Sequence, residues 1–225
     1  MSLPVRSSPQ SKPRSRRSDG AQTRGQILQT AGQLFAINGF ERTTSKEICV
    51  AAGSNMAAVN YHFGDKDGLY DAVLTQAHAQ LVQLADLEKI QHSDQSAEDK
   101  LYALISLFVQ RVNNPALSWG LSVLVHEILA PSNHLPALIQ AAVLPKIRVM
   151  RSLMAQLLEL PDDHPAVQRS LAFVVMPCIM LVIAPNELRQ TILPGLDNAP
   201  DALTQDMAAY ALAGLKSMKQ RYVDS

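Results

Sequence analysis

The stretch TTSKEICVAAGSNMAAVNYHFGDK, residues 43–66, decides how the N-terminal part of this chain folds. Thr44 and Glu47 have the spacing of a capping box, in which the two side chains satisfy free backbone amides at the start of a helix. We therefore expect a helix from Thr44 to about Ala52. Gly53 follows as a residue that ends helices in the left-handed conformation.

A second short helix is expected directly after this turn. Asn55 is a favoured N-cap residue, and Val59 and Phe63 follow at a spacing that places both on one inward face. Gly64 ends this helix and Asp65 caps the next one. Two helices of about two turns, joined by a tight glycine turn, have the spacing of a helix-turn-helix.

The pattern continues as helices on both sides of this stretch. Residues 23–38 place apolar side chains on one helical face and end at Asn38-Gly39, and a longer helix is expected from Lys66 to about Gln91. Further helices are expected near residues 97–113, 116–129, 136–159, 164–184 and 201–222. No segment alternates with period two over a useful length. The predicted fold class is all-α, with a three-helix N-terminal helix-turn-helix domain followed by a larger C-terminal helical domain.

Length and charge suggest how the chain is divided. Its 225 residues suffice for a small domain and a larger one, and the formal net charge is zero. Basic residues nevertheless gather at the N-terminus, which predicts an anionic partner touched by that end. They are Arg6, Lys12, Arg14, Arg16, Arg17 and Arg24, against Asp19 alone. We expect a disordered basic arm over 1–22, a helix-turn-helix domain over 23–70 and a larger helical domain over 71–225, to which the resemblance described below assigns ligand binding and dimerisation.

The second short helix has the residue types that a DNA-reading helix needs. Such a helix lies in the major groove with its N-terminal residues facing base edges. The candidate base contacts are Asn55, Met56, Ala57, Ala58 and Asn60. Either Asn60 reads adenine or an alanine methyl touches a thymine methyl. The candidate phosphate contacts are Thr43, Thr44, Tyr61, His62 and Lys66, the last together with the amides that begin the next helix. Arg24, in the basic segment 6–24, is a further candidate DNA contact that would add salt-dependent affinity. Alternatively, Tyr61 and His62 are ordinary half-buried surface and Thr44 is only a cap.

Residues 27–74, ILQTAGQLFAINGFERTTSKEICVAAGSNMAAVNYHFGDKDGLYDAVL, resemble the TetR-type bacterial transcriptional regulators. The matching positions are Ala31, Phe35, Gly39-Phe40, Thr43-Thr44, Glu47-Ile48, Ala52-Gly53, Tyr61-His62-Phe63, Lys66 and Leu69-Tyr70. The resemblance implies an obligate dimer, a C-terminal ligand pocket, and phosphate contacts by Tyr61, His62 and Lys66. Cys49 and Ser54 depart from the usual small residues. Residues 57–70 look like the CecR- and AefR-like subgroup.

The C-terminal half supplies candidates for a ligand pocket and a dimer face. The pocket candidates are Phe108, Arg111, Trp119, His126, Met150, Met154, Phe173 and Met176. Each of the apolar ones is also typical of an ordinary core, and His126 of a satisfied core histidine. By resemblance, the helices at 164–184 and 201–222 form a four-helix interface with their copies. Its candidate residues are Met180, Leu203, Met207, Tyr210, Ala211, Gly214 and Met218, although this stripe also suits packing within one domain.

Together with these patterns, the resemblance implies a cytoplasmic, ligand-responsive transcriptional repressor that a small apolar or amphipathic molecule releases from a near-palindromic operator. We expect a homodimer without cofactor, metal or membrane partner. The apolar run 171–184 is too short to span a bilayer, and the two cysteines, Cys49 and Cys178, lack ligand spacing. No catalytic ordering of Ser, His and Asp, phosphate loop or carboxylate pair is present, so the chain is not expected to be an enzyme. The alternative is a helical small-molecule-binding or scaffold protein without operator binding.

Overall fold

A computed structural model describes residues 16–111, 118–196 and 199–223, and within these ranges the chain is helical with no β-strand. The all-α prediction is therefore confirmed. In chain order the elements are α1 (Arg16–Asn38), α2 (Ser45–Ala51), α3 (Met56–Phe63), α4 (Lys66–Leu81), α5 (Leu84–Gln91), α6 (Ala97–Val109), α7 (Ser118–Leu129), α8 (Leu135–Leu138), a π-turn (Ile139–Val143), α9 (Leu144–Leu158), α10 (Pro165–Ile183), α11 (Asn186–Ile192), a 3-10 turn (Pro194–Leu196) and α12 (Pro200–Val223).

The predicted caps of the N-terminal helices are present. Thr44 and Glu47 form both halves of the capping box at the start of α2. The Asn55 side chain accepts from Ala58 N to begin α3, and the Asp65 side chain accepts from Gly68 N to begin α4. These bonds are local in sequence, so they fix where the helices begin whatever the rest of the chain does.

Three helix boundaries differ from the expectation. Helix α1 begins at Arg16, so part of the segment expected to be a disordered arm is helical. The helix expected over 66–91 breaks at Val82, which is extended at φ −154° and only 5% exposed. Burying Val82 in the core outweighs one more helical hydrogen bond. The stretch 185–200, expected to be a break, contains α11. Residues 1–15 of the expected arm lie outside the described residues.

A fourth difference lies before α9. The helix expected over 136–159 contains a π-turn at residues 139–143, directly before Pro145 in the first turn of α9. Proline lacks an amide hydrogen and its ring collides with the carbonyl four residues earlier. A wider turn removes that collision, so the helical stretch continues through the proline rather than ending at it.

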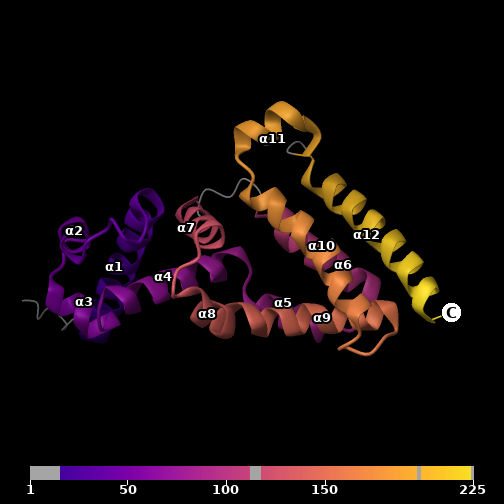
Figure 1. Ribbon diagram of the computed structural model, residues 1–225, viewed down its shortest axis with the longest axis horizontal. Helices are drawn as coiled ribbons and strands as arrows, with labels where there is room; N and C mark the ends of the chain where they lie inside the picture. Colours follow the sequence, from indigo (N-terminus) through magenta and orange to yellow (C-terminus); the bar gives the residue numbers. More distant parts are fainter. Residues whose placement is uncertain (1–15, 112–117, 197–198, 224–225) are drawn as a thin grey trace, which may run out of the picture.

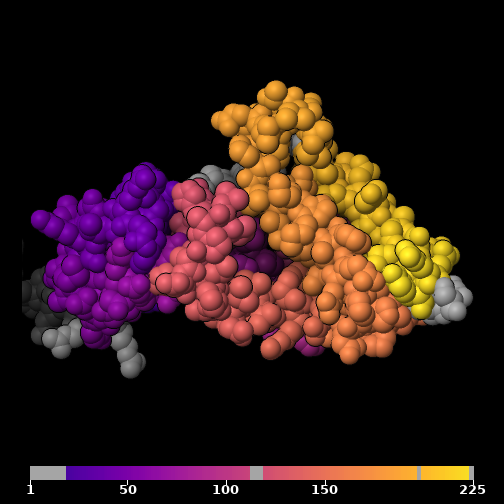
Figure 2. Space-filling model, in the orientation of Figure 1, coloured from indigo at the N-terminus to yellow at the C-terminus, as the bar shows by residue number. Residues whose placement is uncertain are grey.

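Two hydrophobic cores lie along the length of the molecule (Figure 1). The N-terminal core joins α1–α4 to α7, α8 and the π-turn. The C-terminal core lies among α4–α6, α9, α10 and α12. Figure 2 shows α7 (rose) between the indigo lobe made by α1–α3 and the orange and yellow lobe of α9–α12. Helix α7 is therefore the joint between the helix-turn-helix and the C-terminal helices.

The joint is held by Trp119 of α7 against Gly32 of α1. A Cβ atom added at Gly32 would lie 2.5 Å from Cε3 and Cζ3 of Trp119, so the indole fills the space where a side chain would be. The indole N–H donates to Gln29 Oε1 at 3.2 Å. Trp119 is 7% exposed and belongs to the N-terminal core, not to a C-terminal ligand pocket as expected from the sequence.

Helix α10 has the length and composition of a membrane-spanning helix, with 19 residues and a mean hydropathy of 2.0. This helix, at Pro165–Ile183, is longer than the apolar run 171–184 on which the sequence-based expectation rested. However, its most apolar window is 44% buried inside the protein, and α10 packs against α6, α9 and α12. A core helix with one outward apolar face explains the same composition.

A buried pair of basic side chains joins α4 to α9. Lys146 is 6% exposed, and its Nζ lies 2.6 Å from His78 Nδ1 and donates to the His78 carbonyl at 3.2 Å. Burial lowers the pKa of Lys146 to about 8. Burial, together with the charge of Lys146, lowers the pKa of His78 to about 4. His78 therefore remains neutral at neutral pH and accepts a hydrogen bond from the lysine.

Replacing Gly32 with alanine should destabilise the chain by about 1–2 kcal/mol, because the crowding against Trp119 exceeds the gain in helix propensity. Gly25 lies in the same helix and a Cβ there meets nothing within 4 Å. Gly25→Ala should therefore stabilise the chain by about 0.5–1 kcal/mol. Urea unfolding of both variants measures the difference. Equal effects at the two positions would show that the Trp119–Gly32 contact does not restrict the joint.

The His78 pair predicts a defined loss of stability in acid. The folded-state pKa of His78 is about 4 and its ordinary value is 6.5, so the unfolded chain binds more protons between these values. The free energy of unfolding should be about 2 kcal/mol lower near pH 5 than near pH 7 on account of this residue. Urea titrations at both pH values should show this difference in unfolding free energy reduced in His78→Gln. The difference should be retained in His92→Gln, which changes an exposed histidine. An undiminished loss of stability between pH 7 and pH 5 in His78→Gln would show that His78 does not cause it.

Candidate nucleic-acid interface

Helix α3 presents a polar and small-residue face to solvent. Val59 is fully buried in the N-terminal core and holds the helix down from the opposite side. Arg24 of α1 places its guanidinium 5.0 Å from the Phe63 ring and so packs on the end of the helix. The exposed residues are Asn55, Met56, Ala57, Asn60 and Tyr61, whereas Ala58 and His62 are half-buried. A helix with this orientation is suited to enter a groove with its N-terminal end.

Thr43 does not have the position expected of a phosphate contact. Its side chain is fully buried, and its hydroxyl donates to the Gly39 carbonyl at 2.8 Å. This bond lies within the turn that follows α1, where Gly39 has a φ of 76°. Thr44 is exposed, but its hydroxyl and amide both donate to Glu47 Oε2 at 2.8 Å. The sequence prediction was therefore wrong for Thr43, and the structure shows Thr44 as a cap.

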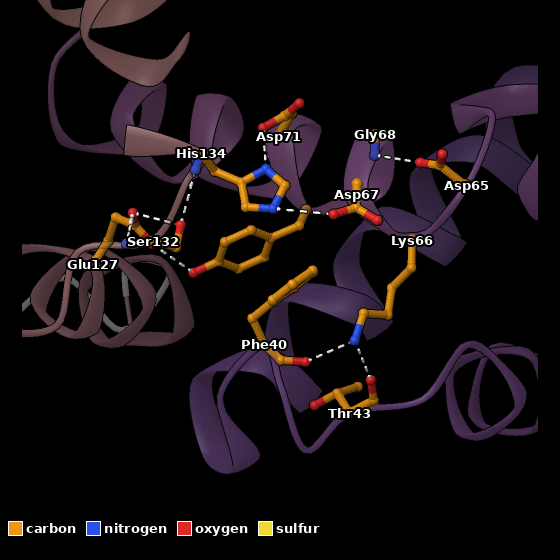
Figure 3. A network of polar contacts seen from close by, with 11 residues as sticks. Phe40, Thr43, Asp65, Lys66, Asp67, Gly68, Asp71, Glu127, Ser132 and His134 are labelled. Atoms are coloured by element: carbon orange, nitrogen blue, oxygen red, sulfur yellow. Dashed lines mark hydrogen bonds and ion pairs between the residues drawn. The ribbon is translucent and has the colours of Figure 1, made fainter. Parts of the chain in front are cut away.

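Lys66 has an internal role that its motif did not indicate (Figure 3). Its ammonium donates to the carbonyls of Phe40 at 3.0 Å and Thr43 at 3.1 Å. The nitrogen also lies 4.1 Å from the centre of the Phe40 ring. Lys66 thus ties the turn between α1 and α2 to the start of α4 and sets the angle at which the two short helices leave α1. Contact of Lys66 with phosphate stays a prediction.

The start of α4 is poorly suited as the second anion site expected from the sequence. The Asp65 carboxylate already accepts from Gly68 N at 2.8 Å, and Asp67 adds a second negative charge in the first turn. Both would repel a phosphate. The phosphate candidates on α3 are Tyr61 and His62: Tyr61 is 84% exposed and its ring lies 4.9 Å from the ring of His62.

A network of polar contacts links α7 and the α7–α8 connection to α4 (Figure 3). Glu127 of α7 is 2% exposed and accepts from Tyr70 Oη at 3.0 Å and from Ser132 Oγ at 2.8 Å. Burial and the neighbouring Glu127 carboxylate raise the pKa of Tyr70 well above its ordinary value. His134 Nδ1 lies 2.7 Å from Asp71 Oδ1. No local signal in the sequence links Glu127 or His134 to α4, which lies more than fifty positions earlier in the chain.

The residues expected to line one ligand pocket lie in separate places. Phe108, Met150 and Met154 are buried in the C-terminal core, and Trp119 is in the N-terminal core. Arg111 pairs with Asp86 at 3.8 Å. The others are exposed: His126, Phe173 at 66% and Met176 at 55%. Because these side chains are divided between two cores and the surface, the expectation that all eight gather in one cavity is wrong.

The residues expected at a dimer face do lie together. A hollow of about 660 Å³ between α10 and α12 and a second of about 430 Å³ beneath α11 share Pro177 and Met207. The seven dimer candidates line one or both of these hollows: Met180, Leu203, Met207, Tyr210, Ala211, Gly214 and Met218. Tyr210 is 86% exposed and Met180 is 57% exposed. The hollows therefore form an apolar surface along α10 and α12.

Replacing Lys66 with methionine should lower the free energy of unfolding by about 1–2 kcal/mol in the absence of DNA, because two carbonyls lose their donor. Lys46 is exposed on α2 and makes a matched control. Lys46→Met should change stability by less than about 0.5 kcal/mol. Urea unfolding of both variants shows whether Lys66 stabilises the fold more than an exposed lysine does. Equal stabilities would show that the carbonyl contacts of Lys66 do not hold the turn.

Comparison with known proteins agrees with this geometry. Residues 27–73 match the model of the family described as bacterial regulatory proteins, tetR family. Over 83 residues the chain is 28% identical to the probable HTH-type transcriptional regulator YttP of Bacillus subtilis, covering 37% of this chain and 40% of that one. Over 62 residues it is 32% identical to the HTH-type transcriptional repressor AcnR of Corynebacterium glutamicum, covering 28% and 33%. The chain thus spans well under half the length of these relatives.

The similarity of fold extends over most of the chain. A putative transcriptional regulator from Pseudomonas aeruginosa PAO1 has a TM-score of 0.69 at 14% identity, over 90% of this chain and 94% of that one. The regulator FadR of Bacillus subtilis, solved in complex with stearoyl-CoA, has a TM-score of 0.60 at 16% identity, over 84% and 98%. Residues 27–73, which contain the helix-turn-helix, therefore match the tetR family of bacterial regulatory proteins, and the described part of the chain shares its fold with solved transcriptional regulators.

Proposed function

We propose that this protein is a dimeric, ligand-responsive transcriptional regulator that binds operator DNA through α3. The observation that carries the proposal is the orientation of α3. Its small and polar residues Met56, Ala57 and Asn60 face solvent while Val59 is fully buried beneath them. The tetR family match covers these residues. Asn60 or the alanine methyls would read base edges, and Tyr61 and His62 would contact phosphate.

A homodimer is supported by the apolar surface along α10 and α12. Tyr210, Met180 and Phe173 are more than half exposed, which is unusual for large apolar side chains on one face. A Cβ at Gly214 would meet nothing within 4 Å, so the backbone of α12 is open to close approach by a partner helix. Two copies joined here would carry two α3 helices, which a near-palindromic operator would receive roughly 34–36 Å apart.

The effector is proposed to be a small apolar or amphipathic molecule. FadR, a fold neighbour, was solved with stearoyl-CoA, which has an apolar chain and a charged head. A ligand changes operator affinity only if it binds the DNA-incompetent state more tightly than the DNA-bound state. Release of a repressor is the mode we favour, since AcnR is named a repressor. The finer likeness to CecR- and AefR-like regulators remains a prediction from residues 57–70.

The remaining parts of the proposal follow from the same assignment. We propose a basic arm over 1–22, a DNA-binding domain over 23–70 and a ligand-binding and dimerisation domain over 71–225, in a cytoplasmic protein. Regulators of this family bind DNA rather than catalyse a reaction, in agreement with the expectation that the chain is not an enzyme. The alternative is a helical small-molecule-binding or scaffold protein without operator binding.

A labelled duplex from the region upstream of the gene separates these possibilities. We expect it to bind about 10³-fold more tightly than a random duplex of equal length at matched salt. Tyr61→Phe should weaken both interactions by about fivefold, because a phosphate contact carries no sequence information. Tyr102→Phe, which changes a tyrosine on α6, should leave both unchanged. Equal affinity of the wild-type protein for the two duplexes would overturn the regulator proposal in favour of the scaffold.

A further inference from the structure

We propose that His134, which lies outside the helix-turn-helix, positions the DNA-reading helices, and that its protonated form does so. The proposal rests on the proposed function for its effect on DNA binding. We call His134 with its two partners on α4, Asp67 and Asp71, the His134 clasp. It joins the connection between α7 and α8 to the first turns of α4 (Figure 3).

Both ring nitrogens of His134 face carboxylates. Nδ1 lies 2.7 Å from Asp71 Oδ1, and Nε2 lies 3.4 Å from Asp67 Oδ1. A neutral imidazole has one N–H and directs a lone pair from its other nitrogen. Only the protonated ring donates on both sides and neutralises the two charges it lies between. The His134 side chain is 12% exposed, so little water is available to take the place of either partner.

The clasp is anchored firmly on its C-terminal side. The His134 amide donates to Ser132 Oγ at 3.1 Å, and Ser132 Oγ donates to Glu127 at 2.8 Å. Glu127 is buried and also accepts from Tyr70 Oη. The backbone of the α7–α8 connection is therefore fixed to α7, and the imidazole is presented from a defined position. A shift of α7 would move His134 with it.

On its N-terminal side the clasp touches the turn that sets the two short helices. The His134 ring centre lies 5.0 Å from that of Phe40 and 5.1 Å from that of Tyr70, and the Phe40 and Tyr70 rings are 4.6 Å apart. The carbonyl and ring of Phe40 are also held by Lys66. A change at His134 thus reaches the α1–α2 turn directly, in addition to any movement along α4.

The charges around the ring are mainly negative. From α4 it faces Asp67, Asp71 and the Tyr70 hydroxyphenyl group, with Lys66 beyond the Phe40 ring. From α7 the Glu127 carboxylate lies behind Ser132 and Tyr70. A neutral His134 ring would keep the hydrogen bond to Asp71 but lose the electrostatic attraction to Asp67. Weaker positioning of α2 and α3 would follow.

The test compares His134→Asn with wild type in the full chain, and uses His92→Asn as a control because His92 is exposed and bonds only to the Glu88 carbonyl. Amide hydrogen exchange without DNA should increase in residues 39–46 and 64–72 of His134→Asn and stay unchanged elsewhere. For duplex from the upstream region, the ratio of the variant Kd to the wild-type Kd should be about threefold near pH 6 and smaller, but still above one, near pH 8.5. Asp71→Asn should reproduce both effects.

The outcomes separate the clasp from the proposed function. If exchange increases locally but the wild-type chain binds no duplex, the clasp stands and the regulator proposal fails. Exchange that increases over all helices alike would overturn the clasp, because His134 would then only stabilise the fold. A Kd ratio that does not change with pH would also overturn the protonated form, and a variant indistinguishable from wild type in both measurements would overturn the whole proposal.

Discussion

The structure depends on one constraint, which is that α3 is too short to be stable alone. An isolated helix of about two turns does not persist in water, because nucleation costs more than a few hydrogen bonds return. Val59 is the fully buried residue of α3, and its burial among α1, α2 and α4 supplies the missing stability. The outward-facing side chains of α3 are therefore not needed to hold the helix on the core. The exposed residues of α3 are available to a partner outside the protein.

The position of α3 in turn depends on a layer of contacts around Phe40. Lys66 reaches across to the carbonyls of the α1–α2 turn, and Thr43 is buried beneath it. These residues belong to a motif associated with DNA contact, yet their resolved bonds are internal. A motif residue can therefore serve recognition by aiming the reading helix rather than by touching DNA. Such residues differ from surface cations in that their replacement alters the free protein.

The sequence was informative where structure is local and uninformative where it depends on tertiary contacts. The capping box of Thr44 and the caps Asn55 and Asp65 lie within three residues of their partners, so spacing alone located the starts of α2, α3 and α4. The break at Val82 has no glycine or proline, and arises because a distant core accepts that side chain. The bond from Tyr70 to Glu127 spans 57 positions and the one between Asp71 and His134 spans 63 positions. Only folding brings these partners together. The scattering of the expected pocket residues has the same cause.

The seat of Trp119 on Gly32 has a mechanical consequence for the whole molecule. A large flat ring set into a notch one residue wide resists sliding of α7 along α1, since translation in either direction would drive the indole into neighbouring side chains. Tilting about the ring disturbs far fewer contacts. The contact therefore restricts translation of α7 along α1 more than rotation about the ring. Because α3 lies at the outer end of its lobe, far from this contact (Figure 1), a small rotation there would displace α3 more than the helices beside α7.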